Sequence, residues 1–227
     1  GADPQCYVLS QSSATLNLSP TQEIVAAYLY WAGSGSLSEG DLDVKLNGID
    51  MVVDRTFTTT LATKPVYGAF SDITALVQTT GNGTYTFSDF DLSGVINSLE
   101  YCNNGTNFGG WSILIIYTEP DLTNNLVNIY DGFERVDSGN QDLLIELTNL
   151  NVLHLVGNKI AFLAWEGDAP LAYNETLKIN GSLISNPPLN PANNVFNGTN
   201  SFTGSNQLYN MDLDYFLRNS DMGSIND

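Results

Sequence analysis

The chain has 227 residues and a mass of 24.6 kDa, the size of one large domain or two small ones. Seven Lys and Arg residues stand against 25 Asp and Glu residues, a formal net charge of -18. A surface this acidic repels nucleic-acid phosphates and anionic lipid head groups, so neither nucleic-acid nor membrane-surface binding is expected. No apolar run approaches the ~20 residues needed to span a bilayer, so no membrane insertion is expected. Only 14% of the residues are charged, below the roughly 25% of an ordinary soluble domain, a composition typical of extracellular β-proteins.

The first strong signal along the chain is the apolar run from Ile24 to Trp31, which predicts a strand buried on both faces. Asn47-Gly48 separates Asp43–Leu46 from Ile49–Phe57 and supplies the two positive φ angles of a type I′ turn, so these segments predict a β-hairpin. A Gly-Asn-Gly turn precedes Thr84–Phe87, which predicts another strand.

The second half of the chain continues the same pattern. Trp111–Tyr117 and Lys159–Trp165 are apolar runs that predict buried strands. Four weaker patterns also predict strands. Three lie between these two runs and one lies after the second: Leu126–Tyr130, Leu143–Leu147, Val152–Val156 and Thr176–Ile179. Short helices are predicted over Ser71–Val77 and Ser93–Tyr101.

Many short strands with little helix indicate an antiparallel architecture. We therefore expect an all-β, jelly-roll-like β-sandwich with one or two short helices, because a jelly roll suits this length better than a seven-stranded sandwich does. A single domain spanning residues 1–227 is predicted. The segment from Met211 to Leu217 has the pattern of an ordered element close to Asp227, which predicts an open sheet edge, a cut chain or a strand supplied by a partner.

Cys6 and Cys102 are the two cysteines, and they are not spaced as a metal or redox pair. We expect them to form one disulfide in an oxidising compartment, tethering the N-terminal segment 1–20. Two buried free thiols are the alternative.

The sequence contains no recognisable catalytic motif. His154 is the only histidine and lies in an apolar run, which excludes a His-based triad or a multi-histidine zinc site. Paired carboxylates are sufficient for glycoside hydrolysis, so a carbohydrate-active enzyme is kept as a third hypothesis. The acids in or beside predicted strands are Glu23, Glu119, Glu146, Glu166 and Asp168.

Closely spaced acids favour calcium, which takes several oxygen ligands from carboxylates, amides and backbone. The pairs considered are Asp212 with Asp214, Glu166 with Asp168, Asp41 with Asp43, and Asp89 with Asp91. Asp212 and Asp214 are the preferred Ca²⁺ ligands. The alternative is that D-x-D on a strand places both acids on one solvated face.

Aromatic residues suggest a sugar-binding surface, since a ring stacks on the apolar face of a pyranose. Trp31, Trp111 and Trp165 end apolar strands and are expected to pack internally. Tyr101, Tyr209 and Tyr215 lie among Asn and Asp residues and are the candidate ligand-binding residues.

Several short sequence segments, taken together, resemble the N-terminal globular region of large bacterial cell-surface proteins, including gliding-motility-type adhesins of Bacteroidetes. They extend over residues 22–217 and are Ala27–Gly33, Val44–Gly48, Ser71–Val77, Gly83–Thr86, Gly110–Tyr117 and Tyr130–Phe133. The motifs are structural rather than catalytic. The resemblance implies a fragment of a longer exported protein, displayed extracellularly at the cell surface.

These observations predict a non-catalytic adhesin module for attachment or gliding motility. Its expected partners are surface glycans, bound with or without Ca²⁺, or a protein on another cell or substratum. The alternative is a structural subunit of a surface filament, assembled with neighbouring subunits by β-strand augmentation.

Overall fold

The computed structural model describes residues 6–102, 106–123, 125–148, 150, 156–169, 174–208 and 210–218. Within these residues the chain is all-β, with twelve strands in antiparallel sheets and three short helices, as the sequence predicts. It divides into two compact units, each described by itself below. The sandwich unit is Ala2–Thr123 with Asp131–Leu143, and the C-terminal unit contains Asn124–Tyr130 and Leu144–Asp227. The single domain over residues 1–227 stays a prediction.

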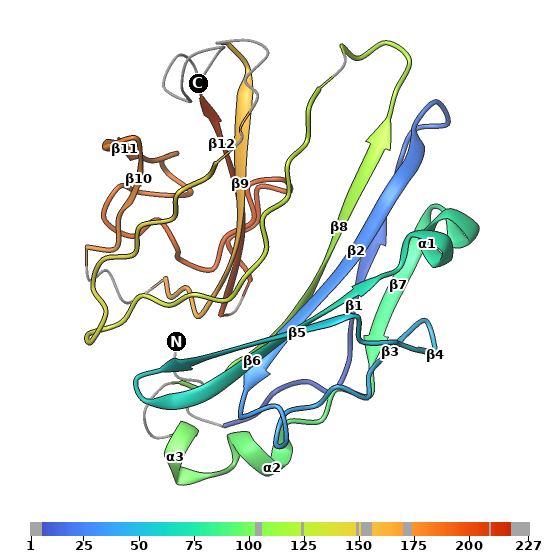
Figure 1. Cartoon of the computed structure of the whole chain (residues 1–227). Helices are drawn as coiled ribbons and strands as arrows, with labels where there is room; N and C mark the ends of the chain where they lie inside the picture. The colour runs from blue at the N-terminus through green and yellow to red at the C-terminus, as the bar shows by residue number, and fades with distance from the viewer. Residues whose placement is uncertain are drawn as a thin grey trace. The chain divides into compact units, whose positions relative to one another are not determined.

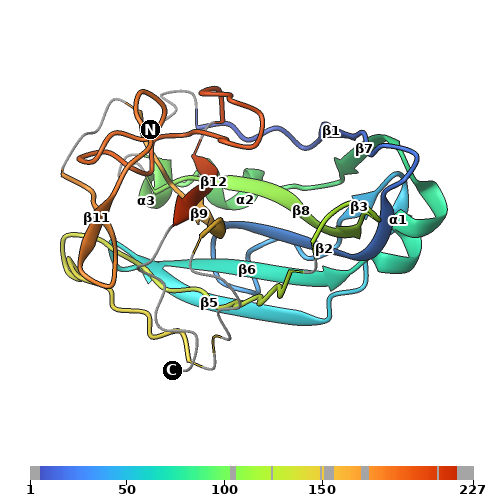
Figure 2. The same cartoon turned by 90° about the horizontal axis from the view of Figure 1, so that it is seen from above.

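Two four-stranded antiparallel sheets form the sandwich unit (Figures 1 and 2). The first has the order β5 (Arg55–Leu61), β6 (Lys64–Asp72), β2 (Glu23–Ser34) and β8 (Gly109–Thr118). The second has the order β1 (Ser12–Leu16), β7 (Gly83–Ser88), β3 (Lys45–Leu46) and β4 (Ile49–Asp50). Figure 2 shows β1 and β7 in one layer, with β2, β6 and β5 in the other.

The core of this unit lies between its two sheets. Leu29 and Trp31 of β2 alternate along the strand on its inner face and are buried, as period-2 packing requires. Phe87 of β7 meets them from the other sheet, its ring centroid 6.3 Å from that of Trp31 and 5.3 Å from that of Trp111. The long apolar strands therefore form because each contributes one face to this core.

Three short helices complete the sandwich unit: α1 (Thr74–Thr80), α2 (Ser93–Ile96) and α3 (Leu99–Cys102). The helix predicted from Ser71 starts later because Ser71 and Asp72 end strand β6. Asp72 still stabilises the first turn of α1, because its Oδ1 accepts a hydrogen bond from the Thr74 N–H at 3.0 Å. None of the described helices is long and apolar enough to cross a membrane.

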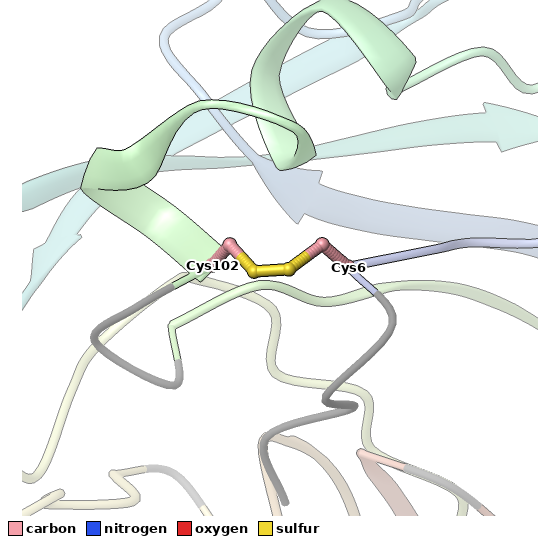
Figure 3. Close-up of a disulfide and its surroundings, with 2 residues drawn as sticks. All are labelled: Cys6 and Cys102. Atoms are coloured by element: carbon pink, nitrogen blue, oxygen red, sulfur yellow. A yellow bond between two sulfur atoms is a disulfide. The ribbon is translucent and has the colours of Figure 1, made fainter.

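A disulfide joins Cys6 to Cys102 at the end of α3, which confirms the predicted pairing (Figure 3). The two Cα atoms lie 5.3 Å apart, and the bond closes a loop with a sequence separation of 96 residues. On the chain-entropy model a loop of this length stabilises the fold by about 4–5 kcal/mol. The bond thus ties the N-terminal segment to the sandwich unit.

The C-terminal unit contains two antiparallel strand pairs. They are β9 (Asn158–Trp165) with β12 (Met211–Arg218), and β10 (Leu177–Ile179) with β11 (Ser182–Ile184). Asn180 and Gly181 have positive φ angles of 48° and 78° and make the tight turn between β10 and β11. Ile184, Val195 and Phe216 form a small core for this unit.

Some predicted strands are wrong. Leu126–Tyr130 and Leu143–Leu147 are irregular, although apolar residues recur in both. Of Val152–Val156, only Val156 is described, and it lies in a bend. The hairpin turn at Asn47-Gly48 is confirmed, but its second strand ends at Asp50, and β5 begins separately in the other sheet. An apolar pattern shows which side chains a strand would bury. Whether the segment becomes a strand also depends on a neighbouring strand with which it can form hydrogen bonds, and the local sequence does not reveal that neighbour.

Candidate functional site

Asp212 and Asp214 lie on the inner face of strand β12 and are 0% and 1% exposed. Phe216, two residues further along the same face, belongs to the apolar core of the C-terminal unit. The alternative interpretation of this D-x-D pair, a solvated strand face, is therefore wrong. Two carboxylates inside a protein must be hydrogen-bonded or neutralised, because their burial without compensation is costly.

Asp214 is fully hydrogen-bonded. Its Oδ1 accepts the Ser201 N–H at 2.9 Å. Its Oδ2 accepts the Asn190 side-chain amide at 2.9 Å, and the Thr199 hydroxyl lies at the same distance. All of these donors are neutral and come from residues 190–201, so Asp214 fixes that loop against β12.

Asp212 is hydrogen-bonded through only one of its carboxylate oxygens. Its Oδ1 accepts the backbone N–H groups of Asn197 and Thr199 at 2.9 and 3.0 Å. Its Oδ2 is buried and has no hydrogen-bond partner. Burial raises the pKa of Asp212 to about 6, with a contribution from Asp214, although the two N–H groups act in the opposite direction.

Glu175 is a third acid near this pair. Its pKa is raised, first by burial and second by the negative charge of Asp212. Glu175 pairs with Asn194 in a parallel β-bridge. The sequence analysis missed this residue because it is an isolated acid in Asn174-Glu175-Thr176, and its approach to Asp212 depends on the loop that carries Asn194.

The turn formed by Glu166, Gly167 and Asp168 reaches Asp212 through its backbone. A Cβ atom at Gly167 would overlap Asp212 Oδ2 and lie 2.9 Å from the carboxylate carbon. Asn194 Nδ2 donates to the carbonyl oxygens of Asp168 and Ala169 at 3.3 and 3.2 Å. The structure thus brings two of the acid pairs proposed as Ca²⁺ ligands near each other, with Gly167 rather than Glu166 or Asp168 in contact with Asp212.

Glu166 itself has a buried Oε1 that no hydrogen bond satisfies. Its backbone has a positive φ of 65°, and its N–H donates to the carbonyl oxygen of Asn210 at 2.8 Å. Burial raises the pKa of Glu166 to about 8. Among the described residues, no three Asp, Glu, His or Cys side chains form a group that could hold a metal ion.

Asp41 and Asp43 belong to the sandwich unit, apart from the acids of the C-terminal unit. Asp41 is half-buried, and its two carboxylate oxygens accept the N–H groups of Asp43 at 2.9 Å and Asp91 at 2.6 Å. Its carbonyl oxygen accepts the Tyr67 hydroxyl and the Trp31 indole N–H. Asp43 is exposed. These contacts give Asp41 a structural role, as the fixed point between two loops.

An aromatic pair, the exposed Phe202 and the half-buried Tyr215, lies on the other face of β12. The Tyr215 and Phe202 ring centroids are 4.9 Å apart, with 51° between the ring planes. The Phe202 side chain is at a loop tip and is 62% exposed, and Lys159 Nζ lies 5.3 Å from the Tyr215 ring centroid. We call Phe202, Tyr215 and Lys159 the aromatic platform.

A hollow of about 210 Å³ adjoins this platform at Tyr215. Its walls combine the apolar Ile184, Phe216 and Leu217 with the polar Ser185, Asn186 and Arg218. The hollow therefore offers hydrogen-bonding groups beside a smaller apolar surface.

The loop that carries Phe202 is held by the acids behind it. Ser201 donates its N–H to Asp214 and accepts the Tyr215 N–H on its hydroxyl at 2.7 Å. Asn200 Oδ1 accepts the N–H groups of Phe202 and Thr203. The buried face of β12 therefore determines where the exposed Phe202 ring meets Tyr215.

Of the three tyrosines expected at a ligand surface, Tyr215 is half-buried and lines the hollow, and its ligand-binding role stays a prediction. Tyr101 is only 4% exposed and donates its hydroxyl to the carbonyl oxygen of Pro65 at 2.9 Å, so its assignment to the surface is wrong. Its Asn-rich neighbours follow in the chain, while Tyr101 itself lies in α3 and packs inward. Tyr209 lies outside the described residues, as does His154.

The sequence analysis also missed an aromatic cluster on the outer face of the sheet that contains β2. Phe70 lies between Tyr28 and Tyr30, with ring centroids at 5.5 and 5.1 Å, and the Arg55 guanidinium carbon is 3.7 Å from the Phe70 ring centroid. Asp131 bonds both Arg55 and the Tyr30 hydroxyl. The cluster is thus one of the contacts that attach segment 131–137 to the sandwich, together with Arg135 on Thr60 and Asp137 on the Ala62 N–H.

The acids considered for glycoside hydrolysis are divided between the units. Glu23 and Glu119 are in the sandwich unit, where Glu119 accepts the Gln22 side-chain amide at 2.8 Å. Glu146, Glu166 and Asp168 belong to the C-terminal unit.

Similarity to known proteins adds nothing to this geometry. Comparison of the chain with protein-family models, curated proteins and solved structures gives no match. The functional assignment therefore depends on the aromatic platform, the hollow beside it and the buried acids of β12.

Proposed function

We propose that this chain is a non-catalytic attachment module displayed outside the cell, which binds glycans at the aromatic platform of its C-terminal unit. The observation that carries the proposal is the pair of an exposed Phe202 and a half-buried Tyr215 beside a hollow with mixed polar and apolar walls. An aromatic ring covers the apolar face of a pyranose, while amide, hydroxyl and guanidinium groups bond its hydroxyls.

The surroundings of the platform supply both kinds of contact. Phe202 and Tyr215 offer ring faces, and Ser185, Asn186 and Arg218 line the adjoining hollow. The hydrogen bonds of Ser201 to Asp214 and Tyr215 hold the loop in place before a ligand arrives. Less conformational entropy is then lost on binding, which favours affinity.

Export to the cell surface is supported by the Cys6–Cys102 disulfide, since disulfides persist in oxidising compartments. The resemblance to the N-terminal globular regions of bacterial surface proteins supports the same location. Attachment or gliding motility is the role that such a location and a glycan site together favour.

The test is a broad glycan array, run in calcium and again in EDTA, followed by affinity measurements on any hit. Phe202→Ala removes the exposed ring, and we expect at least about a tenfold loss of affinity, the equivalent of 1.4 kcal/mol. Leu183→Ala is the matched control, because Leu183 is an exposed apolar residue of the same unit that does not line the hollow. A blank array, or hits that Phe202→Ala retains, would contradict the proposal.

A second candidate function, assembly by strand addition, is favoured by a different observation. Leu126–Tyr130 and Leu143–Leu147 have the sequence pattern of strands but are irregular. Val127, Leu144 and Ile145 among them are 56, 82 and 59% exposed. Exposed apolar segments of this kind mark interaction surfaces, and pairing with a neighbouring copy would satisfy their backbone.

Sedimentation across a range of concentrations tests this second candidate. Assembly predicts a rising molecular mass that Ile145→Lys abolishes, because the charge would have to be buried. Leu217→Lys changes an exposed leucine on β12 and should leave assembly intact. A strictly monomeric wild-type chain at high concentration would eliminate the filament hypothesis.

A further inference from the structure

Buried side-chain atoms without hydrogen-bond partners in the C-terminal unit are all acceptors. They are Glu166 Oε1, Asn190 Oδ1, Asn194 Oδ1 and Asp212 Oδ2. Each such atom destabilises the fold if it remains unsatisfied. A set of orphaned acceptors with no orphaned donor in this unit's described residues indicates that a hydrogen-bond donor or a cation belongs there.

The orientation of the two amides follows from their nitrogen atoms. Asn190 Nδ2 donates to Val195 O and Asp214 Oδ2, and Asn194 Nδ2 donates to the carbonyls of Asp168 and Ala169. Because both nitrogens lie against oxygen acceptors, the unsatisfied atoms are truly the carbonyl oxygens. Asn194 is 4% exposed, so its Oδ1 points into the protein rather than into solvent.

Asp212 and Asn194 both contact the turn that contains Gly167, and Glu175 lies near these two residues. Asp212 Oδ2 lies directly against Gly167. The amide of Asn194 is bonded to the next two carbonyl oxygens of the same turn. Glu175 pairs with Asn194 through the backbone and interacts electrostatically with Asp212.

Asp214 differs from these three because both of its oxygens already accept hydrogen bonds. Every donor given to Asp212 and Asp214 is a backbone N–H, hydroxyl or amide. These neutral groups leave two adjacent buried negative charges without a counter-charge.

We propose that Asp212, Glu175 and Asn194 are ligands of a Ca²⁺ site in the C-terminal unit, with Asp214 as the residue that positions the loop around it. Two carboxylates and an amide carbonyl are hard oxygen ligands, which suit Ca²⁺ rather than zinc or copper. Irregular loops suit the flexible coordination of Ca²⁺ better than the strict octahedron of Mg²⁺. This assignment goes beyond glycan binding and stands whether or not the platform binds a sugar.

Thermal unfolding of the full chain at pH 7.5 tests the site without a glycan. We expect 1 mM Ca²⁺ to raise Tm by at least about 5 °C over EDTA, and Mg²⁺ to raise it much less. Asp212→Asn and Glu175→Gln should each abolish most of the calcium response. Glu146→Gln removes one exposed acid from the same unit and should retain the whole response.

Glu175→Gln keeps the test decisive if Asp212→Asn fails to fold, because Glu175 is only half-buried. Equal Tm values of the wild type in Ca²⁺ and EDTA would overturn the proposal, as would a full calcium response in Glu175→Gln. Calcium titration by calorimetry should give one site in the wild type and none in Glu175→Gln. A stability that ignores calcium, and a fall from pH 5.5 to 7.5 in EDTA that Asp212→Asn removes and Glu166→Gln retains, would assign a proton to Asp212 in place of the cation.

Discussion

Asp214 shows how one side chain can hold a loop in position. Its carboxylate accepts hydrogen bonds from the Ser201 N–H and the Asn190 side-chain amide and contacts the Thr199 hydroxyl. All three partners belong to the loop of residues 190–201. Alanine at this position would leave the Ser201 N–H without its acceptor and would remove one acceptor each from the Asn190 amide and the Thr199 hydroxyl. Each unpaired group costs about 1–3 kcal/mol, which is more than the hydrogen bond itself contributes.

We therefore expect Asp214→Ala to lower the free energy of unfolding of the C-terminal unit by at least about 3 kcal/mol. Urea denaturation followed by circular dichroism measures this loss. Glu146→Ala, an exposed acid of the same unit, should change the unfolding free energy by no more than about 0.5 kcal/mol. Equal effects of the two substitutions would show that Asp214 does not hold the loop.

Glu166 predicts a dependence of stability on pH. Its pKa rises from 4.5 to about 8 on folding because its carboxyl group is buried. Between these values the folded state keeps a proton that the unfolded state has released, so the free energy of unfolding falls as pH rises. One group contributes a slope of at most about 1.4 kcal/mol per pH unit.

Urea denaturation of the wild type and Glu166→Gln at pH 5, 6, 7 and 8 measures this slope. The variant should lose less stability than the wild type over the interval, because glutamine carries no proton to release. Glu146→Gln removes an exposed acid and should behave as the wild type does. A Glu166→Gln variant as pH-dependent as the wild type would exclude Glu166 as the source.

At the scale of the element, the hairpin turn at Asn47-Gly48 is a local feature with a measurable contribution. Gly48 has a φ of 77°, a value that side chains disfavour, and no atom lies within 4 Å of where its Cβ would stand. Gly94 also has free space, but it lies in helix α2. A Cβ atom would meet no neighbouring atom at either glycine, so substitutions at these two positions differ in backbone strain and not in steric overlap.

Gly48→Ala should cost about 1 kcal/mol, because alanine is strained at positive φ. Gly94→Ala should have the opposite sign, since alanine favours helix over glycine by about 0.5–1 kcal/mol. Thermal unfolding of the two variants in parallel measures the difference. Equal Tm values for both would indicate that the turn tolerates a Cβ.

The elements also show what a single sequence reveals. Ile24–Trp31 and Trp111–Tyr117 were correctly predicted as core strands because their apolar content is high throughout. Strand β6 was missed because Pro65 and Gly68 interrupt its pattern. In β12 the alternating acids suggested an outward polar face, whereas Asp212 and Asp214 share the inner face with Phe216.

The site was predictable in part for the same reason. D-x-D spacing singles out Asp212 and Asp214, which the structure buries, and Tyr215 follows directly in the chain; their role as Ca²⁺ ligands stays a prediction. Phe202, Glu175 and Asn194 carry no such spacing and reach the site through loops joined by long-range hydrogen bonds. Tyr101 has polar neighbours in the sequence, which suggested a surface position, but its side chain faces inward from α3 and is buried. The polarity of neighbouring residues does not show which face of a helix is buried.

At the scale of the whole molecule, the disulfide is the largest single constraint on the sandwich unit. Replacing Cys6 and Cys102 with alanine should lower the free energy of unfolding by up to about 4–5 kcal/mol, because the unfolded chain regains the entropy of a long open loop. Guanidinium denaturation of the oxidised wild type and the double variant measures this loss. Unchanged midpoints would contradict the expected stabilisation.

The same bond determines how far the chain can be stretched. A cross-link between residues 96 positions apart keeps strands β1 to β7 inside one covalent ring. Force applied to the two ends bypasses this ring, so about 320 Å of contour length stays out of reach until the bond is reduced. An attachment module pulled by shear would therefore yield in the segments that follow Cys102, while the tethered part remains short. Single-molecule extension with and without reductant should differ by that length.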